Sequence, residues 1–144
     1  FIISELLSID NSSDIINWLF QILKIICDKL DESMRDQHEY LCNSVIAYIK
    51  DNFSKKDLSL NEIASYVNVS PAYLSSLFKK QIGENISTTI TNVRIENACK
   101  LLENTSLSLK EISEKVGYVN QYYFSSCFKK KMDKNPSVYR QEVY

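Results

Sequence analysis

The sequence predicts an all-α protein with two helix-turn-helix subdomains, joined by a long connecting helix and preceded by an N-terminal helical connector. Its 144 residues contain only two glycines and two prolines, which favours long helices over a turn-rich β fold. One short helical phrase occurs twice, as SSLFKK at 75–80 and as SSCFKK at 125–130. Between the two copies, residues 84–104 have helical apolar spacing and no proline. With 44% apolar residues, the chain can bury a core around these helices.

The first forty residues are predicted to form the helical connector. Apolar residues have helical spacing over 1–7 and again over 15–30. A polar loop at 8–14 separates the two segments, and Ser13 or Asp14 in it can cap the second helix. A charged stretch then leads toward the next helix.

That next helix is predicted at 40–53 and begins the second domain, residues 41–144.

The chain starts at Phe1 without an initiator Met, so we expect it to be the C-terminal part of a longer protein with another domain upstream. No apolar run approaches the roughly 20 residues that a membrane helix needs. We therefore expect no membrane contact from this chain.

An apolar stripe along the connector needs a partner. Packing on the rest of the chain or on an upstream domain would cover it, and so would pairing with a second copy. The second interpretation predicts a homodimer, with these candidate contact residues: Trp18, Ile22, Ile25, Ile26 and Leu30.

The repeated phrase belongs to a longer internal repeat, because residues 58–80 align with residues 107–130. The first halves match at an offset of 49 and the second halves at an offset of 50, so one residue is inserted between them. An insertion is tolerated in a turn, and each unit is therefore helix, turn, helix. We place the two units at about 58–82 and 107–132, with the connecting helix at about 84–104.

Local chemistry supports these boundaries. Ser59–Glu62 and Ser108–Glu111 each have the spacing of a capping box, in which both side chains bond to free amides of the first helical turn. The first helices are predicted to end at Asn68 and Gly117, the two residue types that best adopt a left-handed C-cap.

The second helix of each unit is predicted to start after an N-cap, Ser70 or Asn120. On a helical wheel, one side is apolar and the opposite side has small hydroxylated residues flanked by lysines. The apolar sets are Leu74, Leu77 and Phe78, and Phe124, Cys127 and Phe128. A helix with small polar side chains can lie close to a base-pair edge, while lysines reach the phosphates.

Charge and length agree with a nucleic-acid partner for the second domain. The net charge of the whole chain, −1, argues against nucleic-acid binding, but the charge is unevenly distributed. Residues 1–40 hold three basic and eight acidic side chains, a net charge of −5, whereas residues 41–144 hold 14 basic and 10 acidic side chains, a net charge of +4. A connecting helix of about 20 residues is about 30 Å long, close to the roughly 34 Å between successive turns of B-DNA. One chain could therefore reach two adjacent major grooves.

The sequence offers no basis for an enzyme, a cofactor or a metal site. It has no glycine-rich phosphate loop and no nucleophile–histidine set, and His38 is the only histidine. The four cysteines lack metal-ligand spacing, and we expect them to be small buried apolar residues.

Residues 41–142 resemble the AraC/XylS family of bacterial transcription regulators. The resemblance rests on YLSSLFKK followed by Gly83, on Arg94-x-x-x-Ala98-x-x-Leu101-Leu102, on EISEKVGYVNQYYFSSCFKK, and on NPSVYR at 135–140. Asp133, where the family commonly has glycine, and Ile86, where the repeat partner Pro136 is a proline, depart from the pattern at helix ends.

The resemblance implies a cytoplasmic, double-stranded DNA-binding regulator, an activator that contacts RNA polymerase. The connector is similar to that of YesN-like response regulators and membrane-sensor members. Matched by position, the base-reading residues would be Ala72, Ser75, Ser76, Gln121, Tyr122, Ser125 and Ser126. The expected phosphate contacts would come from Ser70, Tyr73, Lys79, Lys80, Asn120, Tyr123, Lys129 and Lys130.

The sequence is also compatible with two other functions. Tandem helix-turn-helix units can also serve as a protein-interaction module without DNA binding, which would show no steep salt dependence with duplex DNA. RNA binding is less well supported, since no aromatic stacking platform is apparent.

Overall fold

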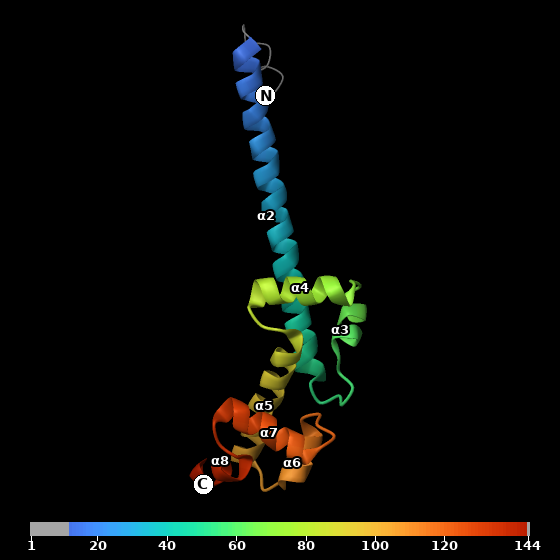
Figure 1. Cartoon of the computed structure of the whole chain (residues 1–144), viewed down its shortest axis with the longest axis vertical. Coiled ribbons are helices and arrows are strands. Elements are labelled where there is room, and N and C mark those ends of the chain that lie inside the picture. Colours follow the sequence, from blue (N-terminus) through green and yellow to red (C-terminus); the bar gives the residue numbers. More distant parts are fainter. Residues whose placement is uncertain (1–11, 144) are drawn as a thin grey trace. The chain divides into compact units, whose positions relative to one another are not determined.

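The structure is a computed structural model that describes residues 12–143. In this part of the chain every regular element is a helix, which confirms the predicted all-α class (Figure 1). The chain divides into two compact units, Phe1–Tyr40 and Leu41–Tyr144. The helices are α2 (Ser12–Asn52), α3 (Leu60–Tyr66), α4 (Pro71–Ile82), α5 (Ile86–Asn104), α6 (Leu109–Lys115), α7 (Gln121–Met132) and α8 (Pro136–Val143).

Helix α2 is longer than the sequence predicted. The predicted helix at 1–7 lies outside the described residues, and α2 already includes Ser13 and Asp14, so neither residue is its N-cap. The charged stretch at 31–39 does not end the helix, because it contains no glycine or proline and most of its residues are good helix formers. The helices predicted at 15–30 and 40–53 are therefore one element.

The first helix-turn-helix is formed by α3 and α4. Ser59 caps α3 by accepting from the backbone N–H of Glu62. The predicted capping box is incomplete, because the Glu62 carboxylate instead accepts from the Tyr48 hydroxyl at 2.9 Å and from Lys55 at 3.2 Å. Asn68 has a φ of 56°, so the predicted left-handed end of this helix is confirmed.

The second helix-turn-helix is formed by α6 and α7. Its capping box is complete: Ser108 accepts from the backbone of Glu111, and the Glu111 carboxylate accepts from the backbone of Ser108 at 2.8 Å. These bonds stabilise the anion and lower the pKa of Glu111. Gly117 has a φ of 90°, again as predicted, and Asn120 caps α7.

The two helix-turn-helix units have separate hydrophobic cores, and α5 contributes residues to both. The last part of α2, α3 and α4 enclose Val45, Ile49, Ile63, Leu74 and Phe78. The second core, under α6, α7 and α8, contains Ile112, Val116, Tyr118, Phe124 and Phe128. The first half of α5 contributes Ile86, Ile90 and Val93 to the first core, and its second half contributes Ile95, Ala98 and Leu102 to the second.

Helix α5 begins at Ile86, two residues later than predicted. The reason is that Glu84 remains before the helix and accepts hydrogen bonds from Thr89 at 2.7 Å and from Asn92 at 3.1 Å. The helix has 19 residues and is therefore about 28 Å long. In the middle of the helix, Arg94 donates hydrogen bonds to two backbone carbonyls, those of Phe53 and Lys55.

Helix α8 docks on the second core. The Tyr139 hydroxyl donates to the Glu103 carboxylate of α5 at 2.6 Å, which raises the pKa of Tyr139. Arg140 donates to the backbone carbonyl of Leu107 at 2.6 Å. Both contacts join the end of the chain to segments more than thirty residues earlier.

The cysteines fit the prediction only in part. Cys42 and Cys99 are buried, and burial raises the pKa of both thiols. Cys127 is half-buried and Cys27 is exposed on α2. The prediction of a buried residue is wrong for Cys27.

Replacing Asp133 by glycine should stabilise the protein. Asp133 ends α7 with a φ of 57°, whereas the equivalent end of α4 has Gly83 at 85°. A left-handed conformation is unfavourable for a residue with a Cβ, so Asp133→Gly should raise the free energy of unfolding by about 0.5–1 kcal/mol. Urea unfolding would measure the change. The matched control, Gly83→Asp, should lower it by a similar amount, and a loss of stability in Asp133→Gly would contradict the argument.

Candidate nucleic-acid interface

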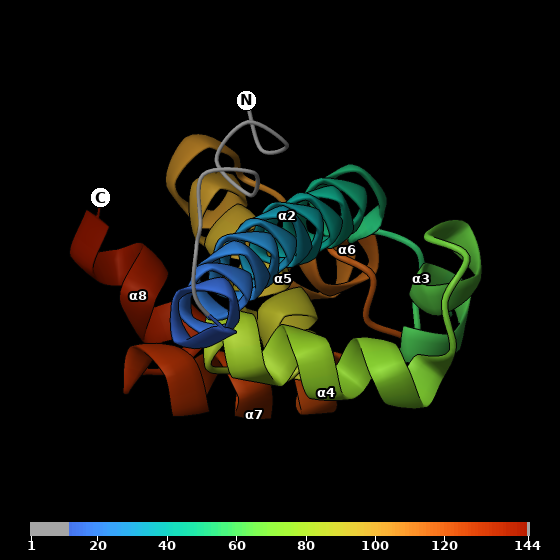
Figure 2. The same cartoon turned by 90° about the horizontal axis from the view of Figure 1, so that it is seen from above.

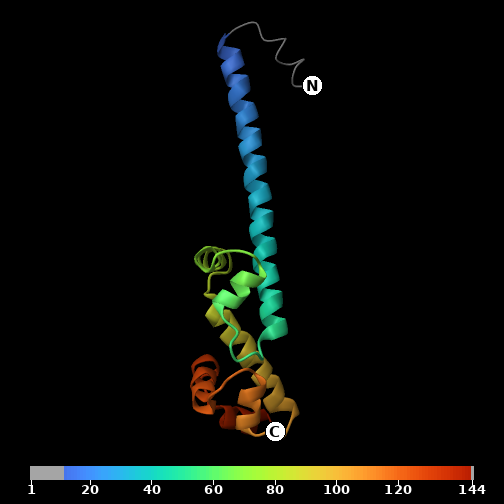
Figure 3. The same ribbon diagram turned by 90° about the vertical axis from the view of Figure 1, so that its right-hand side faces the viewer.

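Helices α4 and α7 lie on the same side of the compact unit formed by residues 41–144. In Figure 1 α4 crosses α2 and α7 crosses α5, yet both run in the same direction, each starting next to the short helix that precedes it. Seen from above in Figure 2, they lie along one edge of this unit, and Figure 3 shows both on the same side of α5. The repeat in the sequence is therefore a repeat in orientation. We call the predicted base-reading residues of these two helices the reading face: Ala72, Ser75, Ser76, Gln121, Tyr122, Ser125 and Ser126.

In α4 the predicted division into two sides is found. Leu74, Leu77 and Phe78 are buried in the first core. Ala72 and Ser76 are exposed and Ser75 is half-buried. At its three reading-face positions α4 therefore has only small side chains, which lets this part of its backbone approach another surface closely.

In α7 the same division holds, with one difference. Phe124 and Phe128 are buried, but Cys127 is only half-buried. Ser126 is exposed and Gln121 and Ser125 are half-buried. Tyr122 is 85% exposed, and this large aromatic ring makes α7 chemically different from α4 on the reading face.

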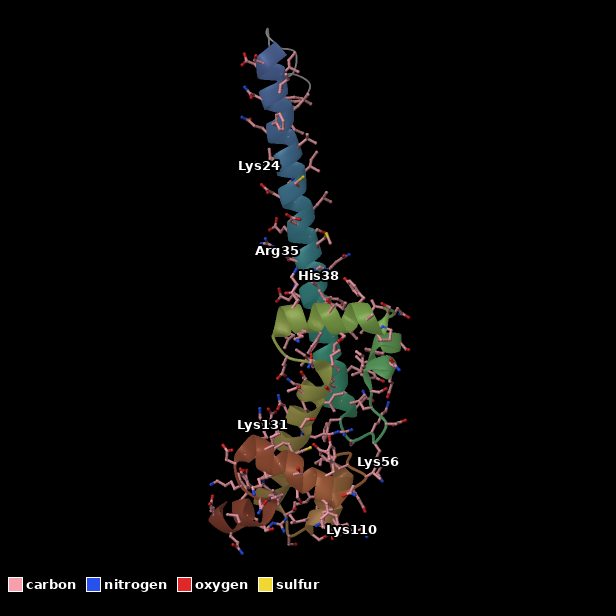
Figure 4. All side chains as sticks on the ribbon, viewed as in Figure 1. Lys24, Arg35, His38, Lys56, Lys110 and Lys131 are labelled. Carbon is pink, nitrogen blue, oxygen red and sulfur yellow. The ribbon has the colours of Figure 1, made fainter. Side chains whose placement is uncertain are left out.

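Lysines cluster in the last turn of both helices. Lys79 and Lys80 end α4, and Lys129, Lys130 and Lys131 end α7, where the negative end of the helix dipole favours cations. In residues 12–143 the ion pairs are Lys55–Glu62 and Lys134–Glu142, so the clustered lysines have no carboxylate partner there. Figure 4 labels Lys131 on α7. The clusters remain available to an external anion.

The predicted phosphate contacts at the helix starts are Ser70 and Asn120. Ser70 accepts from the backbone N–H of Tyr73 at 3.2 Å, and Asn120 accepts from those of Tyr122 at 2.7 Å and Tyr123 at 3.1 Å. Capping uses the acceptor of each side chain. The hydroxyl hydrogen of Ser70 and the amide group of Asn120 can still donate to a phosphate.

Tyr73 and Tyr123 hold equivalent positions at the edge of the reading face. They are 46% and 65% exposed, so neither ring is enclosed by the core. The Tyr123 ring lies 6.0 Å from that of Tyr118, edge-on. Hydrogen bonding with the Cys127 side chain raises the pKa of Tyr123, which keeps its hydroxyl neutral and able to donate.

One part of this surface was not predicted from the sequence. An open hollow of about 410 Å³ lies between the first half of α5 and α7. Its lining combines hydroxyls of α5 with cations of α7: Ser87, Thr88, Thr91, Lys130 and Lys131, together with Glu84, Asn92, Tyr123 and Cys127. The run STTITN at 87–92 was the available signal, because Ser, Thr and Asn have low helix propensity and are unusual in such number in the first turns of a long helix.

Residues 12–143 contain no group of three or more His, Cys, Asp or Glu side chains that could hold a metal ion. No helix in the same range combines the length and the apolar character that spanning a membrane requires.

Comparison with known proteins agrees with the two helix-turn-helix units described above. Residues 63–142 match a protein-family model described as a helix-turn-helix domain, which covers more than half of the chain. An HTH-type transcriptional regulator of Bacillus subtilis, YtdP, is 31% identical over 139 residues, which is 96% of this chain and 18% of that protein. The arabinose operon regulatory protein of Escherichia coli is 31% identical over 125 residues, 87% of this chain and 43% of that protein. This chain thus spans less than half the length of these relatives.

Among solved structures, the chain is similar to the C-terminal domain of AraT, a response regulator from Geobacillus stearothermophilus. The two are 41% identical with a TM-score of 0.69, and the match covers 71% of this chain and 84% of that domain.

Replacing Tyr122 should leave the fold intact, in contrast to replacing Phe124 two residues later. Tyr122 is exposed and Phe124 is fully buried on the same helix. Phe124→Ala should lower the free energy of unfolding by about 3–5 kcal/mol, whereas Tyr122→Ala should change it by less than about 0.5 kcal/mol. Urea unfolding followed by circular dichroism measures both. An equal loss in the two variants would mean that α7 has a different rotation about its axis.

Proposed function

We propose that this chain, which belongs to the AraC/XylS family of helix-turn-helix transcription regulators, binds double-stranded DNA in a sequence-specific manner. Members of this family are DNA-binding regulators and not enzymes. In the proposal, α4 and α7 enter two successive major grooves. The observation that carries it is the common orientation of two helices whose outward sides have small polar residues and end in lysines.

The dimensions of α5 support engagement of two adjacent grooves. At about 28 Å, it approaches the roughly 34 Å between equivalent positions one turn apart on B-DNA. A flexible linker would not preserve this spacing, and a helix packed into both cores does.

Base reading would differ between the two helices. A bidentate arginine–guanine contact discriminates by about 1–3 kcal/mol, but neither α4 nor α7 has an arginine. Ser76 and Ser126 can bond to several bases, while Ala72 offers a methyl contact to thymine. The distinctive contacts would come from Gln121 and Tyr122 of α7, so we propose a relaxed consensus in which DNA shape contributes.

Backbone contacts would come from the lysine clusters and the helix starts. The unit from Leu41 carries a net charge of +4, with 14 basic and 10 acidic side chains. The hydroxyl-lined hollow beside α7 would face the phosphates between the two grooves. Such contacts set position and overall affinity but carry no direct sequence information.

We further propose a role in activating transcription through contact with RNA polymerase, in the bacterial cytoplasm. Its support is family membership and the names of relatives, which include an operon regulatory protein and a response regulator. A sensor or receiver domain upstream of residue 1 would supply the signal. The connector at 1–40 would transmit it to the DNA-binding domain at 41–144.

Homodimerisation through the connector is the proposed use of its apolar stripe. Ile25, Ile26 and Leu30 are about half exposed, while Trp18 and Ile22 are more covered. Further exposed residues widen the stripe, and Ile16, Leu19, Leu23, Ile26 and Leu30 alternate at spacings of three and four. Such spacing is typical of the apolar seam of a two-stranded coiled coil, so we propose a second copy of the chain as the partner.

DNA binding should depend steeply on salt, with defined contributions from single lysines. Each lysine that neutralises a phosphate adds nearly one to the slope of log affinity against log salt concentration. With a duplex obtained by selection from a random library, Lys79→Gln and Lys129→Gln should each lower that slope by about one. Lys100→Gln removes the same charge from α5, outside the reading face, and should leave the slope unchanged. Salt-independent binding, or equal effects of all three changes, would refute the proposal.

Charge placed in the apolar stripe should abolish dimers. Ile26→Asp would bury a carboxylate in the pairing seam and Ile22→Asp would place one directly beside it, which is unfavourable without a partner charge. Sedimentation velocity at tens of micromolar should show a dimer for the parent chain and a monomer for both variants. Gln21→Asp, on the opposite side of the helix, is the control and should remain dimeric. Unchanged sedimentation of Ile26→Asp would exclude this interface.

A further inference from the structure

The relative orientation of α4 and α7 determines whether both can enter DNA at once. Each helix belongs to a different core, and both cores pack on α5. A shared helix sets the distance between the two units. Their rotation about that helix must be set by contacts that cross from one unit to the other.

Arg94, in the middle of α5, makes such contacts. Its Nε donates to the backbone carbonyl of Phe53 at 2.9 Å, and one terminal nitrogen donates to the carbonyl of Lys55 at 2.6 Å. Both carbonyls follow the end of α2, where the helix dipole favours a cation. The guanidinium carbon of Arg94 lies 5.3 Å from the centre of the Tyr118 ring, in the turn of the second helix-turn-helix. Arg94 therefore connects α5 with the segment that follows α2 and with the second helix-turn-helix.

The second unit is closely fitted to this junction. At Gly117, a Cβ would lie 2.5 Å from the carbonyl oxygen of Phe53 and 3.0 Å from a terminal nitrogen of Arg94. Only glycine allows the turn of the second helix-turn-helix to approach so closely. The Phe53 side chain packs against both cores. The turn preceding α7 is thus held directly against the segment that follows α2.

We propose that Arg94 is a positioning residue that fixes α4 and α7 in one relative orientation, so that the chain requires a fixed spacing between its two DNA half-sites. The inference rests on the proposed DNA binding. The proposed role needs no contact between Arg94 and DNA, because two of its three nitrogens donate to backbone carbonyls and its half-buried guanidinium lies against the Tyr118 ring. Lysine cannot replace it fully, because an ammonium lacks the planar fork that reaches two carbonyls together.

The first measurement needs no DNA. Spin labels on cysteines introduced at Lys80 and Lys130, both exposed, report the distance between the two helices in the full chain after Cys27 and Cys127 are changed to serine. Arg94→Lys keeps the charge and should fold, yet its distance distribution should be broader than that of the parent. Lys100→Gln, on the same helix, should leave the distribution unchanged. Equal widths in the parent and Arg94→Lys would overturn the proposal.

The second measurement uses the selected duplex, a duplex with one half-site randomised, and a duplex with one base pair inserted between the half-sites. Arg94→Lys should bind the intact site about tenfold more weakly, while its affinity for the single half-site changes less than about twofold. One inserted base pair rotates the second half-site by about 35° and should penalise the parent more than the variant. The inference would be overturned if Arg94→Lys lost affinity equally for the intact site and for the single half-site. It would also be overturned if the inserted base pair lowered the affinity of the parent and of the variant by the same factor. Failure of the parent to bind any duplex would instead refute the proposed function, and the label distances would still test the junction.

Discussion

The structure depends on one constraint: α5 is buried on two sides in succession. Its first half completes the core beneath α4 and its second half completes the core beneath α7, and the change occurs between Val93 and Ile95. Two residues on a helix are about 200° apart, so the helix turns nearly opposite sides to its two units. Neither core is complete without it. The two units are therefore parts of one folded body, although the sequence repeats as if they were separate.

In the proposed complex, this arrangement would suit weak individual contacts. Serines on α4 and α7 would permit close approach but can bond to more than one base, so each helix alone would discriminate poorly. When two such helices are held together, binding of the first would raise the effective concentration of the second at its groove. Selectivity would then arise from the combination of both sites and their spacing. Tyr122 is exposed on α7 without a counterpart on α4, and this difference would give the pair a direction along the DNA.

Local features of the fold could be predicted from the sequence, and features that depend on distant partners could not. Asn68 and Gly117 adopt the left-handed backbone conformation because the chain leaves a short helix at each of them. Asn and Gly are the residue types that best adopt this conformation, so it could be predicted from the sequence. By contrast, Glu62 leaves its capping box for Tyr48, fourteen residues earlier, and Arg94 reaches carbonyls some forty residues away. Nothing near these residues in sequence indicates those partners. The hydroxyl-lined hollow was missed because α5 and α7 form it together.

The internal repeat continues into α8. Residues 133–137, DKNPS, occupy the place in the second helix-turn-helix that residues 83–87, GENIS, occupy in the first, so α8 is the counterpart of α5. The two counterparts differ in their packing, because α5 contributes to both cores whereas α8 is bound to α5 through the hydrogen bond from Tyr139 to Glu103. The same structural position therefore joins two cores in the first repeat and covers a single core in the second.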